Sequence, residues 1–165
     1  MNRQKTNLSM TVLMAPDMAN FAGKVHGGAI LKLLDQVAYA CAARYSKSYV
    51  VTVSVDQVFF KQPIHVGELV TFQASVNYVG RSSMEIGIRV EAENVQTQET
   101  RHTNSCYLTM VALGEDGKPI EVPPLSIETA VEKERYEAAK LRKAMRNDAL
   151  SKTKRLHVGG GTGAG

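Results

Sequence analysis

The hydrophobic positions of this chain follow two different periods, and each period predicts a different kind of element. Between Gly28 and about Arg44, apolar residues recur at helical spacing, in a stripe wider than a surface helix usually carries. The stripe consists of Ile30, Leu33, Leu34, Val37, Ala38, Cys41 and Ala42. A helix with so wide an apolar face buries most of its surface. The pattern therefore predicts one central helix over this range.

Much of the remaining chain alternates apolar and polar residues and is rich in β-formers, which predicts strands. The predicted strands cover residues 9–15, 49–60, 69–78, 84–95 and 103–113. One antiparallel sheet has one face to bury, and only one long apolar helix is available to cover it. We therefore expect an α+β fold in which a curved antiparallel β-sheet wraps around the central long α-helix.

A second helix of a different kind is predicted near the C-terminus. Beyond Pro123-Pro124, residues 130–152 are helix-prone, with glutamates early and lysines and arginines late, which matches the helix dipole. The last residues are almost all glycine, which favours disorder. We expect three parts: a main domain over 8–125, a basic C-terminal helical extension over 126–155, and a disordered glycine-rich tail over 156–165.

The net charge of +4 is concentrated in the C-terminal helix. Residues 135–155 contain eight basic and two acidic side chains, a net charge of +6, so the rest of the chain carries −2. A main domain with this negative net charge does not present the basic surface that binds a phosphate backbone. No DNA-binding motif occurs either. We expect no nucleic-acid partner.

Membrane and redox functions are disfavoured as well. No run of about 18 apolar residues occurs, and the N-terminus lacks an apolar stretch, so we expect no membrane partner, no secretion signal and a cytoplasmic location. Cys41 and Cys106 do not form a CxxC pair and lie in apolar segments, which predicts buried structural thiols.

One carboxylate lies inside the otherwise apolar helix. Asp35 falls at the margin of the stripe, seven residues after Gly28, so it can face a cleft. The glycines at the helix start, Gly27 and Gly28, leave amides free to bind an oxygen anion. Together these features favour an acyl-transfer site, where helix-start amides polarise a carbonyl and a carboxylate activates water or attacks directly. A solvated or paired aspartate is the alternative interpretation.

The histidines offer a competing base and no metal site. His26 stands directly before the two glycines, where it serves either as a base or as a residue that orients the loop. His65, His102 and His157 are scattered without metal-ligand spacing. We expect no metal.

Several segments, taken in order, resemble one known family. The run from Asn20 to Asp35, Asn-Phe-Ala-Gly-Lys-Val-His-Gly-Gly-Ala-Ile-Leu-Lys-Leu-Leu-Asp, resembles the signature of the hotdog-fold acyl-CoA thioesterases. Residues 53–68, 78–85, 104–112 and 119–124 resemble later blocks of the same family, and the likeness extends over residues 8 to 145. The resemblance implies the hotdog fold and hydrolysis of fatty acyl-CoA to free fatty acid and coenzyme A.

The resemblance also implies roles for individual residues. Asn20 and Asp35 would be the catalytic pair, contributed to one site by different subunits, with Asp35 as general base or nucleophile. The amide of Gly28 would hold the thioester oxygen. The implied substrate contacts, including one from the basic helix, are His26, Gly27, Phe60, Lys61, Pro63, Gly80, Arg81, Ser82, Ser83 and Arg142.

Self-association follows from the same resemblance, which implies hotdog dimers assembled as a trimer of dimers. No cofactor is expected, because coenzyme A is part of the substrate and product. Two alternatives remain open: a hotdog dehydratase, in which His26 would act with an acid, and a non-catalytic acyl-CoA-binding protein. The binding protein would return a bound thioester intact, whereas a thioesterase would hydrolyse it.

Overall fold

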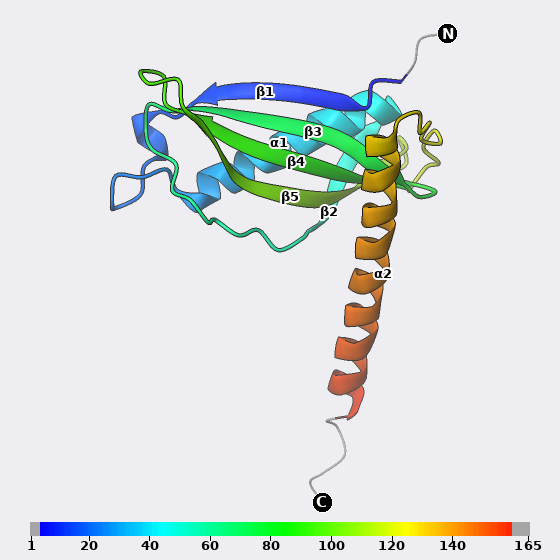
Figure 1. The fold of residues 1–165 in the computed structure, drawn as a ribbon. Coiled ribbons are helices and arrows are strands. Elements are labelled where there is room, and N and C mark those ends of the chain that lie inside the picture. Colours follow the sequence, from blue (N-terminus) through cyan, green and yellow to red (C-terminus); the bar gives the residue numbers. More distant parts are fainter. Residues whose placement is uncertain (1–3, 160–165) are drawn as a thin grey trace, which may run out of the picture. The chain divides into compact units, whose positions relative to one another are not determined.

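The computed structural model describes residues 4–159, which divide into two compact units (Figure 1). The first unit ends at Leu125 and the second begins at Ser126. The elements of the first unit are β1 (Asn7–Leu13), a short 3-10 helix η1 (Pro16–Met18), α1 (Gly27–Ser46), β2 (Tyr49–Val55), β3 (Leu69–Val79), β4 (Ser83–Glu93) and β5 (Thr100–Leu113). The second unit contains α2 (Ala130–Gly159).

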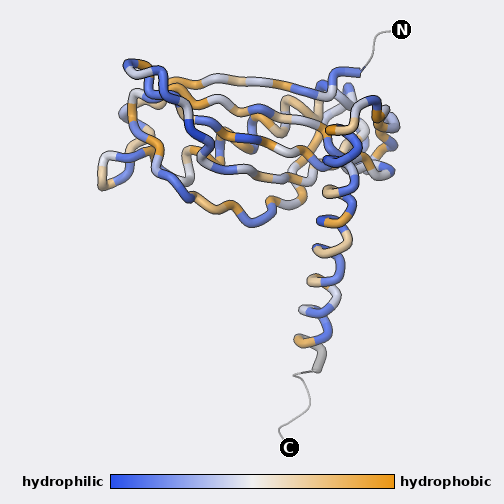
Figure 2. Tube along the Cα trace, viewed as in Figure 1, coloured by the Kyte–Doolittle hydropathy of each residue, from blue (hydrophilic) through white to orange (hydrophobic). Residues whose placement is uncertain are grey.

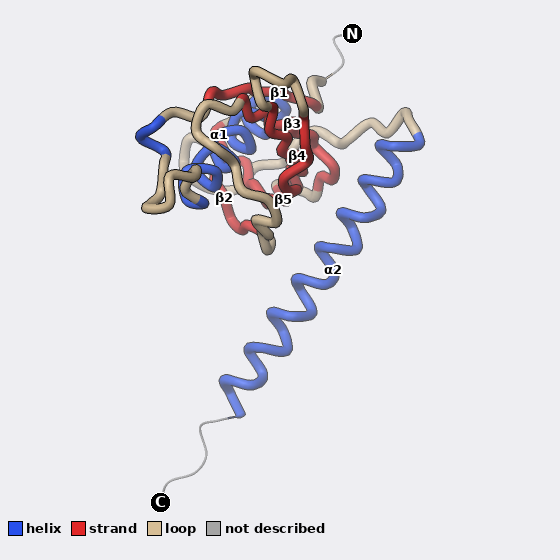
Figure 3. Tube along the Cα trace, turned by 60° about the vertical axis from the view of Figure 1, so that its left-hand side comes forward, coloured by secondary structure: helices blue, strands red, loops and turns tan. Residues whose placement is uncertain are grey.

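The five strands form one antiparallel sheet in the order β1-β3-β4-β5-β2, so that β1 and β2 are its edges. Register shifts interrupt three of the four strand pairs, and such bulges bend a sheet. α1 contacts all five strands, and Figure 3 shows the sheet curling around it. The predicted α+β hotdog fold is confirmed.

Alternation along the strands places one face of the sheet against α1. In the central strand β4, the residues Met84, Ile86, Ile88, Val90 and Ala92 are all buried. Figure 2 shows hydrophobic and hydrophilic residues following one another along the strands. Six of the seven residues in the predicted helical stripe are buried against this face, and Leu33 is partly buried. The predicted central helix is confirmed, with one more residue at its start and two at its end.

The predicted continuation of β2 to residue 60 is wrong. The strand ends at Val55, and the amide of Asp56 makes the last backbone bond to β5, to the Tyr107 carbonyl at 2.9 Å. Beyond it, Phe60 packs on the start of α1 instead of following β5: a β-carbon added to Gly27 would lie 3.7 Å from its ring. A run of adjacent apolar residues at 58–60 thus marks a loop that reaches another element.

The second unit is a single long helix with a defined start. The hydroxyl oxygen of Thr129 accepts the Glu132 amide hydrogen at 3.1 Å, and the Glu132 carboxylate accepts the amide hydrogens of Glu128 and Thr129 at 2.7 and 3.1 Å. This reciprocal capping fixes the helix start. None of the helices described between residues 4 and 159 has the length and hydropathy of a membrane span.

The predicted boundary of the disordered tail is wrong at its start. Residues 156–159 continue α2, because no helix breaker precedes Gly159. The rest of the predicted tail, residues 160–165, lies outside the described residues.

Both cysteines are buried, as predicted, and their thiols should be unreactive in the native protein. Burial raises the pKa of Cys41 and of Cys106 to about 11 each, so almost no thiolate is present near neutral pH. We expect Ellman's reagent to detect neither cysteine in native protein and both after denaturation. Rapid labelling of the native protein would contradict this burial.

Candidate active site

The start of α1 is capped by the histidine that precedes it. His26 has an extended backbone, and its Nδ1 atom accepts the Gly28 amide hydrogen at 3.1 Å. This bond requires an unprotonated Nδ1, so the ring hydrogen of neutral His26 is on Nε2. The Gly28 amide, predicted to bind the thioester oxygen, is therefore occupied in this arrangement. The amide of Gly27 forms no hydrogen bond within residues 4–159.

Asn20 organises the tight loop before the helix. Its side-chain oxygen accepts the backbone amide hydrogens of Ala22 at 2.9 Å and Lys24 at 3.1 Å. Its backbone amide donates to the Lys24 carbonyl at 2.6 Å. The turn closes at Gly23, whose φ of +76° suits glycine. These two bonds occupy the side-chain oxygen of Asn20, so its NH₂ group is the part left to donate a hydrogen bond to a ligand. Phe21, next to it, is fully exposed.

Asp35 lies on the face of α1 that the sheet leaves uncovered. It is exposed, and Leu31 and Tyr39, one turn to either side, are 40% and 43% exposed. The Thr52 hydroxyl on β2 donates to Asp35 Oδ1 at 2.5 Å. A hydrogen bond to one carboxylate oxygen fixes the orientation of the Asp35 side chain. Asp35 thus lies at the margin of the apolar stripe, as predicted, and has a partner that the sequence did not predict.

The predicted coenzyme A contacts form two groups at opposite ends of the sheet. One group surrounds the start of α1, where Phe60 covers Gly27 and the loop through Lys61 and Pro63 follows. The other is the β3–β4 hairpin: the Gly80 amide donates to the Ser83 carbonyl at 2.8 Å, and the Arg81 and Ser82 carbonyls accept the amide hydrogens of Val122 and Ala112. The 11 residues of β4 separate the two ends, which at ~3.4 Å per residue is about 35 Å.

The predictions for Arg142 and for the absence of a metal or cofactor are not tested by this structure. Arg142 lies in α2, in the second unit, so its assignment to the coenzyme A site stays a prediction. Among residues 4–159, no three histidine, cysteine, aspartate or glutamate side chains are grouped so as to hold a metal ion. The absence of a metal or cofactor from the reaction also stays a prediction.

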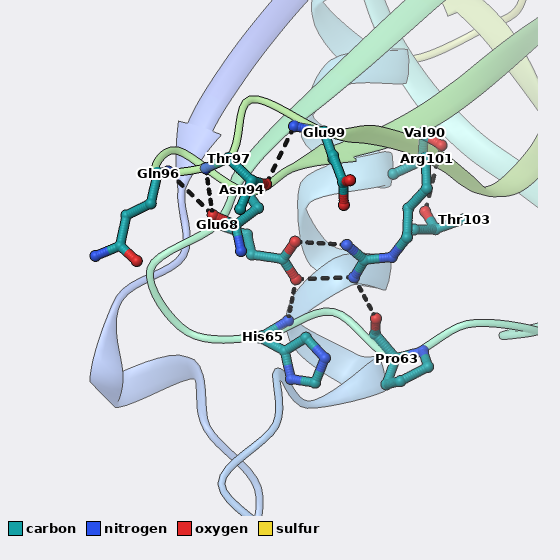
Figure 4. A network of polar contacts seen from close by, with 10 residues as sticks. All are labelled: Pro63, His65, Glu68, Val90, Asn94, Gln96, Thr97, Glu99, Arg101 and Thr103. Atoms are coloured by element: carbon teal, nitrogen blue, oxygen red, sulfur yellow. Dashed lines mark hydrogen bonds and ion pairs between the residues drawn. The ribbon is translucent and has the colours of Figure 1, made fainter.

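A buried ion pair, missed by the sequence analysis, holds the loop between β2 and β3 (Figure 4). Glu68 is 5% exposed, and both of its carboxylate oxygens accept hydrogens from the Arg101 guanidinium, at 2.6 and 2.8 Å. These bonds are the main reason that the pKa of Glu68 lies below its ordinary value, since burial alone would raise it. The signal available in the sequence was a charged residue within the apolar run Val66-Gly-Glu-Leu-Val70.

Comparison with known proteins establishes the family. Residues 22–98 match the model of the thioesterase superfamily. The chain is 52% identical over 149 residues to the protein VdlD of Helicobacter pylori, covering 90% of this chain and 85% of that one. The chain therefore belongs to the thioesterase superfamily.

Two solved structures share the fold over nearly the whole chain. An apo-hexameric acyl-CoA thioesterase matches with a TM-score of 0.84 at 38% identity, covering 87% of this chain and 92% of that one. The acyl-CoA hydrolase of Staphylococcus aureus, solved with butyryl coenzyme A, coenzyme A and coenzyme A disulfide, matches with a TM-score of 0.79 at 31% identity, covering 92% and 94%. Structures of that hydrolase also exist with one asparagine, one aspartate and one threonine each replaced by alanine, and these positions are spaced 15 and 17 residues apart.

The lowered pKa of Glu68 predicts how its contribution to stability varies with pH. A carboxyl whose pKa is lower in the folded state stabilises the fold above its unfolded pKa, and this contribution disappears as the pH falls through the folded pKa. We expect Glu68→Gln to lower the free energy of unfolding by about 1–3 kcal/mol near neutral pH. The difference from wild type should shrink below pH 4.5, the ordinary value for glutamate. Urea denaturation at neutral and acid pH measures it, and a difference that stays constant would contradict the assignment.

Proposed function

We propose that this protein hydrolyses acyl-CoA thioesters to a carboxylate and coenzyme A, with Asp35 as general base and Asn20 of a second subunit completing the site. One observation carries the assignment of residues. Asn20, Asp35 and Thr52 are spaced 15 and 17 residues apart, the same residue types at the same spacing as the three positions replaced in the Staphylococcus aureus hydrolase. The bond from Thr52 to Asp35 supports a shared role for two of them.

The geometry of Asp35 suits proton transfer from water. The Thr52 hydroxyl occupies Oδ1, so Oδ2 is available to accept a proton from a water molecule beside the thioester. As the water oxygen bonds to the carbonyl carbon, its proton passes to Asp35. The tetrahedral intermediate then collapses, the carbon–sulfur bond breaks, and the proton leaves with the coenzyme A thiol. The products are a fatty acid and free coenzyme A.

The thioester oxygen needs hydrogen-bond donors where its negative charge develops, and the start of α1 supplies them. Gly27 offers an amide without a partner in the described chain. The Gly28 amide becomes available only if the His26 ring turns away and gives up its capping bond. The NH₂ group of Asn20, supplied by the partner subunit, completes the proposed set of donors.

The surface around Asp35 supports dimerisation. Leu31 and Tyr39 flank it on α1, and the neighbouring edge strand β2 exposes Tyr49 at 61% and Val53 at 60%. An edge strand with such side chains is a template for pairing with another chain. A second copy would cover this surface and exclude water from around Asp35. The electrostatic interactions of its carboxylate are stronger in such a site. We propose a trimer of dimers, which the hexameric structural neighbour supports.

The dehydratase alternative finds less support. It needs His26 as the reacting base, whereas the Nδ1 atom of His26 caps α1 and only Nε2 is left. A non-catalytic acyl-CoA-binding protein would use the same binding residues as the hydrolase, so only an experiment distinguishes the two.

Replacing the proposed base should slow turnover strongly while keeping the fold. We expect Asp35→Asn to lower kcat by about 10²- to 10⁴-fold, because the amide has nearly the same shape but cannot accept the proton. Thr52→Val should cause a smaller loss, because it removes only the bond that orients Asp35. Thiol release from acyl-CoAs of short to long chain measures both effects and ranks the substrates.

Asp116→Asn is the matched control, since Asp116 lies in the turn after β5 and its Oδ1 acceptor is kept. It should leave kcat unchanged. Near-normal turnover by Asp35→Asn would refute the assignment of the base. Wild-type protein that binds every acyl-CoA tested and returns it intact would favour the non-catalytic alternative.

A further inference from the structure

The loop between β2 and β3, residues 56–68, is tied to other elements by hydrogen bonds at residues 63 to 65. It contains neither helix nor strand, yet it carries Phe60, Lys61 and Pro63, three of the predicted coenzyme A contacts. Surface loops are usually mobile, whereas binding residues work best on a backbone that is held in place before the ligand arrives. The interactions that hold this loop are therefore candidates for a functional role.

Arg101 holds the loop at more points than its ion pair alone. The nitrogen Nη2, which donates to Glu68, also donates to the Pro63 carbonyl at 2.6 Å. Glu68 Oε1 in turn accepts the His65 amide hydrogen at 2.7 Å. Figure 4 shows the guanidinium lying between the Glu68 carboxylate and Pro63. The planar fork of an arginine suits several acceptors at once, so the backbone is fixed at residues 63, 65 and 68.

The same loop continues into the one that carries Asn20. The amide of Val25 donates to the Ile64 carbonyl at 2.9 Å, and Lys24 pairs with His65 in an isolated antiparallel bridge. Lys24 is in turn the residue whose carbonyl accepts the Asn20 amide hydrogen. A continuous series of backbone bonds thus connects Arg101 with the loop of Asn20.

The anchor itself lies within the hydrogen-bonded ladder of β4 and β5. Arg101 pairs with Ala92 in the β4–β5 ladder, and Ala92 is fully buried. Its side chain is 31% exposed and that of Glu68 only 7%, so the pair is largely removed from solvent. An ion pair in this setting keeps its geometry better than an exposed one.

We propose that Arg101 and Glu68 are positioning residues that hold the substrate-binding loop 56–68, and through it the Asn20 loop, in the arrangement that accepts coenzyme A. The inference rests on the proposed function, because it assumes that Phe60, Lys61 and Pro63 contact coenzyme A. Without the pair, the loop would have to become ordered when the ligand binds, and that cost weakens binding.

A purely structural role for the pair makes a different prediction, and a double substitution separates the two. In Glu68→Met with Arg101→Met, two flexible apolar side chains replace the buried carboxylate and its partly exposed partner, a change that is often neutral for stability when both charges of a pair are removed together. The bonds to the Pro63 carbonyl and the His65 amide are lost. If the pair only stabilises the fold, the two methionines replace it and coenzyme A binding is unchanged. If the pair positions the loop, the fold is kept but coenzyme A binding weakens.

The experiment measures the melting temperature, the Kd for coenzyme A by calorimetry, and KM and kcat for an acyl-CoA. We expect the double variant to keep a melting temperature close to wild type, while Kd and KM rise by roughly tenfold to a hundredfold. The matched control is Arg89→Met with Glu91→Met. That pair has a similar bond of 2.8 Å on β4 but is more exposed, and its loss should change neither Kd nor KM.

A double variant with wild-type stability and wild-type Kd would overturn the proposal. If the double variant does not fold, Arg101→Lys decides, because one ammonium keeps the charge opposite Glu68 but cannot reproduce the fork. A raised Kd in this variant supports the positioning role, and an unchanged Kd refutes it. Wild-type protein that binds coenzyme A without hydrolysing acyl-CoA would refute the proposed reaction and leave this test valid, because its readout is binding.

Discussion

The packing of α1 against all five strands determines where the other functional elements of the first unit lie. A single helix can cover the face of a five-stranded sheet only if the sheet curves, and the register shifts between strands allow that curvature. The curvature buries one side of α1 and leaves the side with Asp35 beside the edge strand β2. The proposed base is therefore next to the surface on which a second chain would pair, and it meets Thr52 there.

The loops at one end of the sheet depend on the same packing. The start of α1, the Asn20 loop and the β2–β3 loop meet where β5 begins, and the Glu68–Arg101 pair joins the last of these to the sheet. The β3–β4 hairpin lies at the other end, a full strand length away. This separation favours an arrangement in which different subunits supply the two sets of predicted contacts to one coenzyme A molecule, as proposed for the catalytic pair.

The sequence predicted those parts of the fold that follow from local periodicity. The stripe on α1 and the alternation in β3, β4 and β5 depend only on neighbouring residues, so their positions were predicted to within three residues. The end of β2 was missed because the chain leaves β5 after Asp56, and Phe60 lies against Gly27 at the start of α1. The end of α2 was placed too early because the apolar content of residues 153–158 is low, although nothing in them stops a helix.

The site was predicted only as far as a family resemblance and local pattern extend. Asn20, Asp35 and Gly28 lie within one continuous motif, but the capping bond that occupies the Gly28 amide depends on a side-chain rotamer. Thr52 and Asp35 are 17 residues apart, and Glu68 and Arg101 are 33 apart. Contacts at such separations are set by how α1 and the strands pack, and no periodicity in the chain encodes them.

We propose that each active site combines Asn20 of one subunit with Asp35 of another, and mixing two inactive variants distinguishes this arrangement from a site within one chain. Asn20→Ala and Asp35→Asn chains, co-expressed with different affinity tags and purified through both tags, form mixed dimers. If the site is shared, one of the two sites in each mixed dimer contains both native residues, so thiol release should reappear, at up to about half the wild-type rate if every dimer of the hexamer is mixed. Mixed dimers that stay as inactive as either parent would contradict the account, because both residues would then belong to the same chain.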